Sequence, residues 1–123
     1  MESVALNVLG LPMDVCCESP LTGFYRDGLC RTDTEDQGRH IVCCEMTEEF
    51  LAFSKAAGND LSTPMPMYQF PGLLPGDHWC LCALRWVEAL EQNKAPKIFL
   101  KRTHRKILQF VTIDVLKKYA LDL

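Results

Sequence analysis

The residues of this chain best suited to chemistry are its seven cysteines, two of which lie beside a tryptophan in the segment Gly76-Asp77-His78-Trp79-Cys80-Leu81-Cys82. An aspartate accepts hydrogen bonds from the free N–H groups of a first helical turn, so we expect a helix to begin at Asp77. Cys80 would then lie where the helix dipole favours a thiolate, which is the nucleophilic form of cysteine. The alternative interpretation is that Cys80 and Cys82 are small buried side chains next to tryptophan.

A wider set of cysteines suggests a metal site. Thiolates bind zinc tetrahedrally, and such a site would tie a long loop to the core. The usual pair of cysteines separated by two to four residues is absent, and His40 and Cys43 on one strand would point to opposite faces. If the chain is extended up to Cys82, the last two cysteines share one face and could bind one metal ion. The candidate ligands are Cys16, Cys30, Cys43, Cys80 and Cys82.

A catalytic set of cysteine, histidine and aspartate is a further hypothesis, and it leaves enzymatic activity open. Its candidate members are Cys80 or Cys82, then His40, His78 or His104, then Asp60 or Asp77. The sequence has no glycine-rich phosphate loop and no nucleotide-binding fingerprint.

Apolar periodicity and capping residues predict the elements that must position these groups. Thr47 and Gly58 are the expected start and stop of one helix, and a central helix should run from Asp77 to about Asn93 with Trp86 on its buried face. Thr103 and Thr112 should each cap a short C-terminal helix. Short strands are expected at Val4–Leu9, His40–Met46 and Lys97–Lys101.

Two segments without periodicity, residues 10–39 and 59–78, are long for a chain of this size. They contain large apolar side chains such as Phe24, Tyr25, Phe70 and Leu73, so we expect them to be ordered and to wall a cleft. The sum is an α+β fold in which about three helices pack on a small sheet. The length of 123 residues predicts a single domain, residues 1–123.

Composition and charge limit the partners. The chain has no run of 18 apolar residues and no basic, apolar leader, so we expect a cytoplasmic protein without a membrane span. Residues 94–123 hold 8 of the 13 lysines and arginines but only 2 of the 16 acids. A basic end of this kind can serve a protein-interaction adaptor, whereas the lack of interleaved aromatic residues argues against nucleic acid.

Several strings resemble the uncharacterised bacterial family known as domain of unknown function 2237. They are NVLG from Asn7, PLTGFYRDGLC ending at Cys30, HIVC ending at Cys43, MTEEFLAFSKAAGNDLSTP ending at Pro64, and FPGLLPGDHWCLCALRW ending at Trp86. The resemblance covers nearly the whole chain. It implies no activity, because the family has none to carry over. Cys17 and Cys44 are extra relative to the family pattern.

The leading hypothesis is a binding module for a small molecule or a metal ion, with zinc as the candidate metal. The expected ligand-binding residues are Trp79, Cys80, Cys82, Asp77, Asn59 and Asp60. They concentrate thiol, indole and polar groups at one helix end beside the proline-rich loop. A thiol-dependent enzyme that uses Cys80 and an adaptor that uses the basic C-terminal region are the alternatives.

Overall fold

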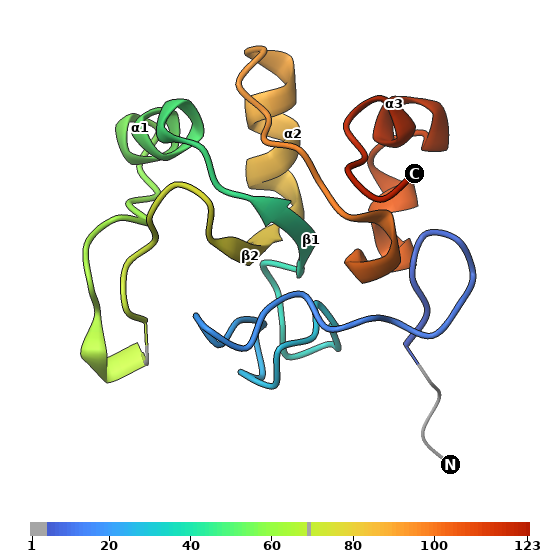
Figure 1. Cartoon of the computed structure of the whole chain (residues 1–123), viewed down its shortest axis with the longest axis horizontal. Helices are drawn as coiled ribbons and strands as arrows, with labels where there is room; N and C mark the ends of the chain where they lie inside the picture. Colours follow the sequence, from blue (N-terminus) through green and yellow to red (C-terminus); the bar gives the residue numbers. More distant parts are fainter. Residues whose placement is uncertain (1–4, 69) are drawn as a thin grey trace.

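The centre of the molecule is a two-stranded antiparallel sheet formed by β1 (His40–Glu45) and β2 (His78–Cys82) (Figure 1). This is a computed structural model, and it describes residues 5–68 and 70–123. Cys43 lies opposite Cys80, and His40 lies opposite Cys82 after a bulge between His40 and Val42. The prediction of a strand at His40–Met46 is confirmed.

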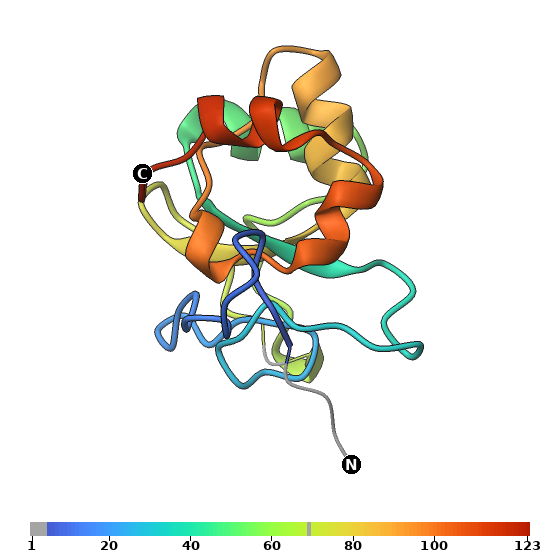
Figure 2. The ribbon, with the colours of Figure 1, turned by 90° about the vertical axis from the view of Figure 1, so that its right-hand side faces the viewer.

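Three helices lie on one side of this sheet and the N-terminal loop lies on the other, as the two views at right angles show (Figures 1 and 2). The α+β fold with a small sheet and three helices is confirmed. The helices are α1 (Glu48–Ala56), α2 (Ala83–Glu91) and α3 (Ile113–Lys118), with short 3-10 helices η1 (Pro66–Tyr68), η2 (Leu100–Arg102) and η3 (Arg105–Gln109). No helix among the described residues is long and apolar enough to cross a membrane.

The start of the central helix differs from the sequence prediction. Residues His78–Cys82 form β2, and α2 begins only at Ala83. Asp77 is therefore not a helix cap; its carboxylate closes a turn by accepting the Leu74 N–H at 2.9 Å. Pairing with β1 places Leu81 in the main core and Cys80 on the other face of the sheet. A buried strand satisfies these backbone groups as fully as a helix does, so local capping signals could not decide between them.

Trp86 anchors α2 in the core, as the apolar pattern predicts. Its side chain is fully buried, and its indole N–H donates to the Pro96 carbonyl at 3.1 Å. The ring of Tyr119 meets it edge to face, with centroids 5.5 Å apart. The main core thus joins α2 to the chain segment that follows α3.

The remaining local predictions have mixed outcomes. Thr47 and Thr112 cap α1 and α3 as expected. Ile98 forms isolated bridges with Cys44 and Ala120, so the expected strand at Lys97–Lys101 reduces to one residue before η2 begins. His104, not Thr103, caps η3 through its ring. At Val4–Leu9, Leu6 and Asn7 form single bridges, while Val4 lies outside the described residues.

Both long loops pack against the rest of the molecule. Phe70 and Leu73 are buried, and the Leu73 N–H donates to the Leu61 carbonyl at 2.8 Å. Gly72 has a positive φ of 81°, and a Cβ there would lie 2.6 Å from the Ser62 carbonyl oxygen, so this turn requires glycine. The two predicted anchors in the first loop are less buried: Phe24 is 39% exposed and Tyr25 is half-buried.

Candidate functional site

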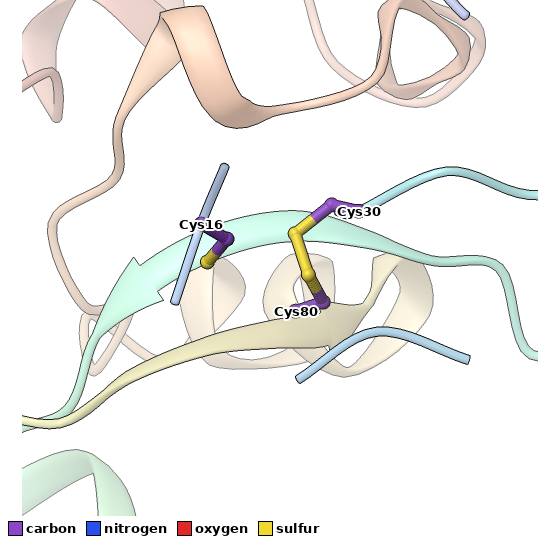
Figure 3. Close-up of side chains that lie close together, drawn as sticks. All are labelled: Cys16, Cys30 and Cys80. Carbon is purple, nitrogen blue, oxygen red and sulfur yellow. A yellow bond between two sulfur atoms is a disulfide. The ribbon is translucent and has the colours of Figure 1, made fainter. Parts of the chain in front are cut away.

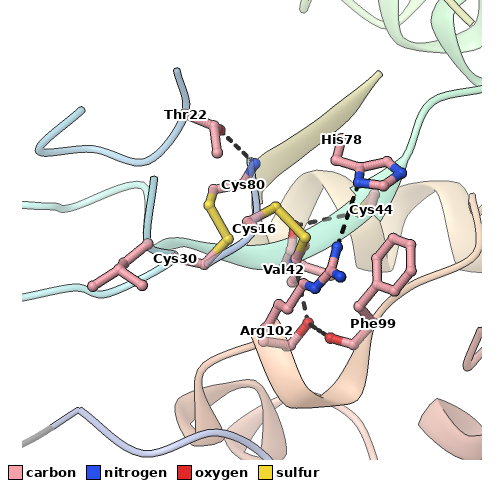
Figure 4. Close-up of a disulfide and its surroundings, with 12 residues drawn as sticks. Cys16, Thr22, Cys30, Val42, Cys44, His78, Cys80, Phe99 and Arg102 are labelled. Atoms are coloured by element: carbon pink, nitrogen blue, oxygen red, sulfur yellow. Dashed lines mark hydrogen bonds between the residues drawn. A yellow bond between two sulfur atoms is a disulfide. The ribbon is translucent and has the colours of Figure 1, made fainter. Parts of the chain in front are cut away.

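Four cysteines from three segments meet between the N-terminal loop and the sheet (Figures 3 and 4). Cys16 and Cys30 come from the loop, and Cys43 and Cys80 face each other across β1 and β2. Disulfides join Cys16 to Cys43 and Cys30 to Cys80, and all four side chains are buried. The Cys80 N–H also donates to the Thr22 hydroxyl at 2.8 Å. The cluster therefore fixes the N-terminal loop on both strands.

This arrangement corrects two expectations about thiols. Cys80 is not a first-turn thiolate, because it lies on a strand, is 1% exposed and is bonded to Cys30. Cys82 does not share a site with Cys80, although the chain is extended there. Its Sγ lies 2.7 Å from the Gly38 carbonyl oxygen, and its thiol is free. Four of the five candidate metal ligands are thus together, and Cys82 is separate.

A pocket of about 360 Å³ opens beside the other face of β2. A volume of this size is typical of small-molecule sites. Four of the six predicted ligand-binding residues line it, namely Asn59, Asp60, Trp79 and Cys82. Cys80 and Asp77 do not. The rest of the lining is Arg26, His40, Leu61, Met65, Tyr68, Phe70, Leu81 and Arg85.

Arg26 supplies an unneutralised positive charge to the pocket wall. Its guanidinium donates to the carbonyl oxygens of Gly23 at 2.6 Å and Tyr68 at 3.2 Å, and it forms no salt bridge with the residues that the structure describes. Its Nε is buried and has no hydrogen-bond partner among them. Burial lowers the pKa of Arg26 from its ordinary value, yet arginine keeps its charge in proteins. The backbone of Arg26 is left-handed, with φ 54°, which is unusual for a residue with a side chain.

Aromatic rings form the adjacent wall. The Arg26 guanidinium carbon lies 5.1 Å from the centroid of the Trp79 ring, within cation–π range. Phe70 meets Trp79 edge to face with centroids 5.1 Å apart. Both rings are more than nine-tenths buried, so the pocket has an apolar wall next to a cation.

The polar edge of the pocket holds one carboxylate that is already engaged. Asp60 accepts hydrogen bonds from the Thr63 hydroxyl at 2.6 Å and the Ser62 N–H at 2.9 Å. These two bonds hold the pKa of Asp60 below its ordinary value. Arg85 lies on the same pocket and donates to the Ala57 carbonyl at 3.2 Å.

His40 reaches the pocket from β1 and is held by a buried carboxylate. Its Nδ1 lies 2.6 Å from Asp36 Oδ1, and the Asp36 side chain is 0% exposed. Asp36 Oδ2 accepts the His40 N–H at 2.8 Å and the Thr32 hydroxyl at 3.0 Å. Among the candidates for a catalytic set, His40, Cys82 and Asp60 line the same pocket. The carboxylate that contacts His40 is that of Asp36, which was not among the expected partners.

Sequence reasoning missed Arg26, Arg85 and Asp36. Arg26 had a weak signal, because it lies in a turn between Gly23 and Gly28, where left-handed residues often serve function. The other histidines lie elsewhere: His78 packs on Phe99, and His104 is buried, which with Lys106 and Arg105 lowers its pKa to about 4. A role for the basic C-terminal region stays a prediction.

Residues 6–120 match the family described as "Uncharacterized protein conserved in bacteria (DUF2237)". No curated protein matches the sequence.

Proposed function

Since the chain belongs to the DUF2237 family, whose description names no activity, we propose its function from the pocket: it binds a small molecule that carries an anionic group on an apolar ring. The observation that carries this proposal is Arg26. Burying a charged group with an unpartnered N–H costs folding free energy, and binding of an anionic ligand would offset that cost.

The neighbouring wall supports the ring part of the ligand. Trp79 and Phe70, though largely buried, line the pocket beside the cation, and an apolar wall next to a positive charge suits a molecule with an apolar ring and one charged end. Asp60 forms no salt bridge with Arg26 among the described residues; its carboxylate oxygens accept from Ser62 and Thr63. Trp79, Cys82, Asn59 and Asp60 remain the proposed binding residues, joined by Arg26 and Arg85.

We expect naphthalene-2-sulfonate to bind this pocket more tightly than neutral 2-naphthol does. In ¹⁵N NMR spectra the indole N–H of Trp79 should shift on titration, while that of Trp86, bonded to Pro96, should not. Arg26→Met should weaken sulfonate binding about 10- to 150-fold, the loss expected for one hydrogen bond to a charged group. Affinity for 2-naphthol should change little.

Arg31→Met is the matched control, because Arg31 belongs to the same loop but pairs with Asp27 and does not line the pocket. Equal affinity for the charged and neutral probes, or equal effects of the two arginine substitutions, would contradict the proposal.

A cytoplasmic location is part of this proposal and leads to a second candidate function. Reducing compartments keep most cysteines as thiols, so the two disulfides would not persist there. Four reduced thiols would remain buried together. The Sγ atoms of Cys16, Cys30 and Cys80 lie within 4.8 Å of one another, and Cys43 is beside them. Tetrahedral zinc holds its sulfur ligands about 3.8 Å apart, so the reduced cluster suits a structural zinc site.

Protein purified under reduction, without chelator or affinity metal, should then contain about one zinc ion per chain by elemental analysis. Cys43→Ser should abolish the signal because it removes a ligand. Cys82→Ser should retain it, since Cys82 lies outside the cluster. Metal-free reduced protein, or zinc that depends on Cys82, would refute this candidate.

A further inference from the structure

Three groups at the edge of the pocket have the arrangement of a nucleophile, a base and a group that orients the base. Asp36, when ionised, can only accept hydrogen bonds, so the proton shared with His40 lies on the ring Nδ1. In the neutral form of the imidazole, the second ring nitrogen, Nε2, is then left with a lone pair. The His40 side chain is 39% exposed and lines the pocket, so the ring is accessible to a molecule bound there.

Cys82 is the thiol next to that histidine. The two residues are opposite each other in the strand register, where side chains on one face are neighbours. Gly38 lies between them: its carbonyl accepts from the Cys82 thiol at 2.7 Å, and a Cβ on it would be 2.9 Å from the His40 ring carbon Cε1. Thiol and ring therefore both lie beside Gly38, on paired residues that line the same pocket.

The other cysteines do not combine these properties. Cys16, Cys30, Cys43 and Cys80 are disulfide-bonded. Cys44 is fully buried and bonded to the Val42 carbonyl, and burial raises the pKa of its thiol well above the ordinary value. Cys17 is free and half-buried but does not line the pocket. Among the described residues, Cys82 is thus the free thiol that lines the pocket and is paired with a histidine in the sheet.

We infer that Cys82, His40 and Asp36 form an acyl-transfer site, with a small carboxylic ester or thioester as substrate. Cys82 is the nucleophile, His40 the general base, and Asp36 a positioning residue that fixes the ring. The recognition of an anionic group on that substrate rests on the proposed function of the pocket, whereas the reactivity of Cys82 does not.

The reaction balances without any oxidant or metal. Rotation of the Cys82 side chain exchanges its hydrogen bond to Gly38 for one to His40. The ring nitrogen takes the thiol proton, the sulfur forms a bond to the carbonyl carbon, and the π pair moves to oxygen. When the oxygen pair returns, the alcohol or thiol leaves with the proton from His40. Water then attacks the acyl carbon while His40 takes a proton from it. The carbon–sulfur bond breaks as His40 returns that proton to the sulfur, and a carboxylic acid is released.

p-Nitrophenyl acetate is a suitable probe because it is neutral and does not need the arginine side of the pocket. Under non-reducing conditions we expect acetylation of Cys82 at least 100-fold faster than that of Cys17, as measured by mass spectrometry of peptides after timed quenching. Cys17 serves as the reference thiol within the same molecule. Cys44 should stay unmodified, which verifies that the protein is folded.

His40→Asn distinguishes a role of His40 as general base from a purely structural role. The asparagine amide can still donate to Asp36, but the base at Nε2 is gone. Acetylation of Cys82 should fall about 10²- to 10⁴-fold while that of Cys17 is unchanged. If His40 only holds the turn through Asp36, the rates will not change. Either that result or equal rates for Cys82 and Cys17 in the wild type overturns the inference.

Asp36→Asn tests the positioning role by comparing two quantities: the rate of Cys82 acetylation and the affinity of the pocket for its ligand. It should lower the acetylation rate of Cys82 at saturating ester, with no change in the dissociation constant of naphthalene-2-sulfonate. A parallel loss of both would mean that Asp36 only maintains the pocket. Failure of sulfonate binding in the wild type would refute the proposed function, and failure of Cys82 acetylation would refute this site alone.

Discussion

Trp86→Ala should lower the free energy of unfolding by about 3–5 kcal/mol, because it removes a large, fully buried ring and leaves a cavity under α2. It also leaves the Pro96 carbonyl without the indole donor. Urea denaturation followed by circular dichroism measures this change.

Leu84→Ala is the matched control on the same helix. Leu84 is 61% exposed, so its truncation should change stability by less than about 0.5 kcal/mol. Similar effects of the two substitutions would mean that α2 does not pack into the core through Trp86.

Loss of the Cys30–Cys80 disulfide should lower the free energy of unfolding by about as much as Trp86→Ala does. The bond closes a loop between cysteines 50 residues apart, and constraint of such a loop in the unfolded chain stabilises the fold by about 4 kcal/mol. The double substitution Cys30→Ala and Cys80→Ala should therefore shift the urea midpoint strongly. Cys17→Ala, which changes a free thiol, should not.

The disulfides themselves can be counted first. Alkylation of oxidised protein in denaturant, without reductant, should modify only the three free cysteines, Cys17, Cys44 and Cys82. Modification of all seven would show that the cluster exists as thiols. The double substitution would then remove no disulfide, and the stability loss expected from the opened loop would not occur. That outcome would direct attention to the zinc candidate.

The sequence predicted elements whose signals are local. Thr47 caps α1 by accepting the Phe50 N–H, and an interaction over three residues can be recognised without tertiary information. The β2 segment could not be recognised in this way. Its backbone pairs with β1, more than thirty residues earlier, and its alternation of Trp79 and Leu81 with Cys80 is too short to distinguish from a helix face.

The candidate site was predictable only in part for the same reason. Trp79, Cys82, Asn59 and Asp60 were found because chemically distinctive residues cluster in two short strings. Arg26 reaches Trp79 from another loop, and nothing in the spacing of the two residues indicates that contact. The pairing of Asp36 with His40 spans four residues, but its meaning depends on Cys82 lying opposite His40 in the sheet.

The register of the sheet also has a consequence for how the two disulfides would form wherever the protein is oxidised. Cys43 and Cys80 face each other, so zipping of the two strands alone brings together two thiols that are not partners in the finished molecule. Four cysteines permit three pairings, and the native one requires Cys16 and Cys30 to arrive from the N-terminal loop. Oxidation that follows docking of that loop therefore gives the native pairs directly. A chain oxidised too early would acquire a bridge across the strands and would need thiol exchange to escape it.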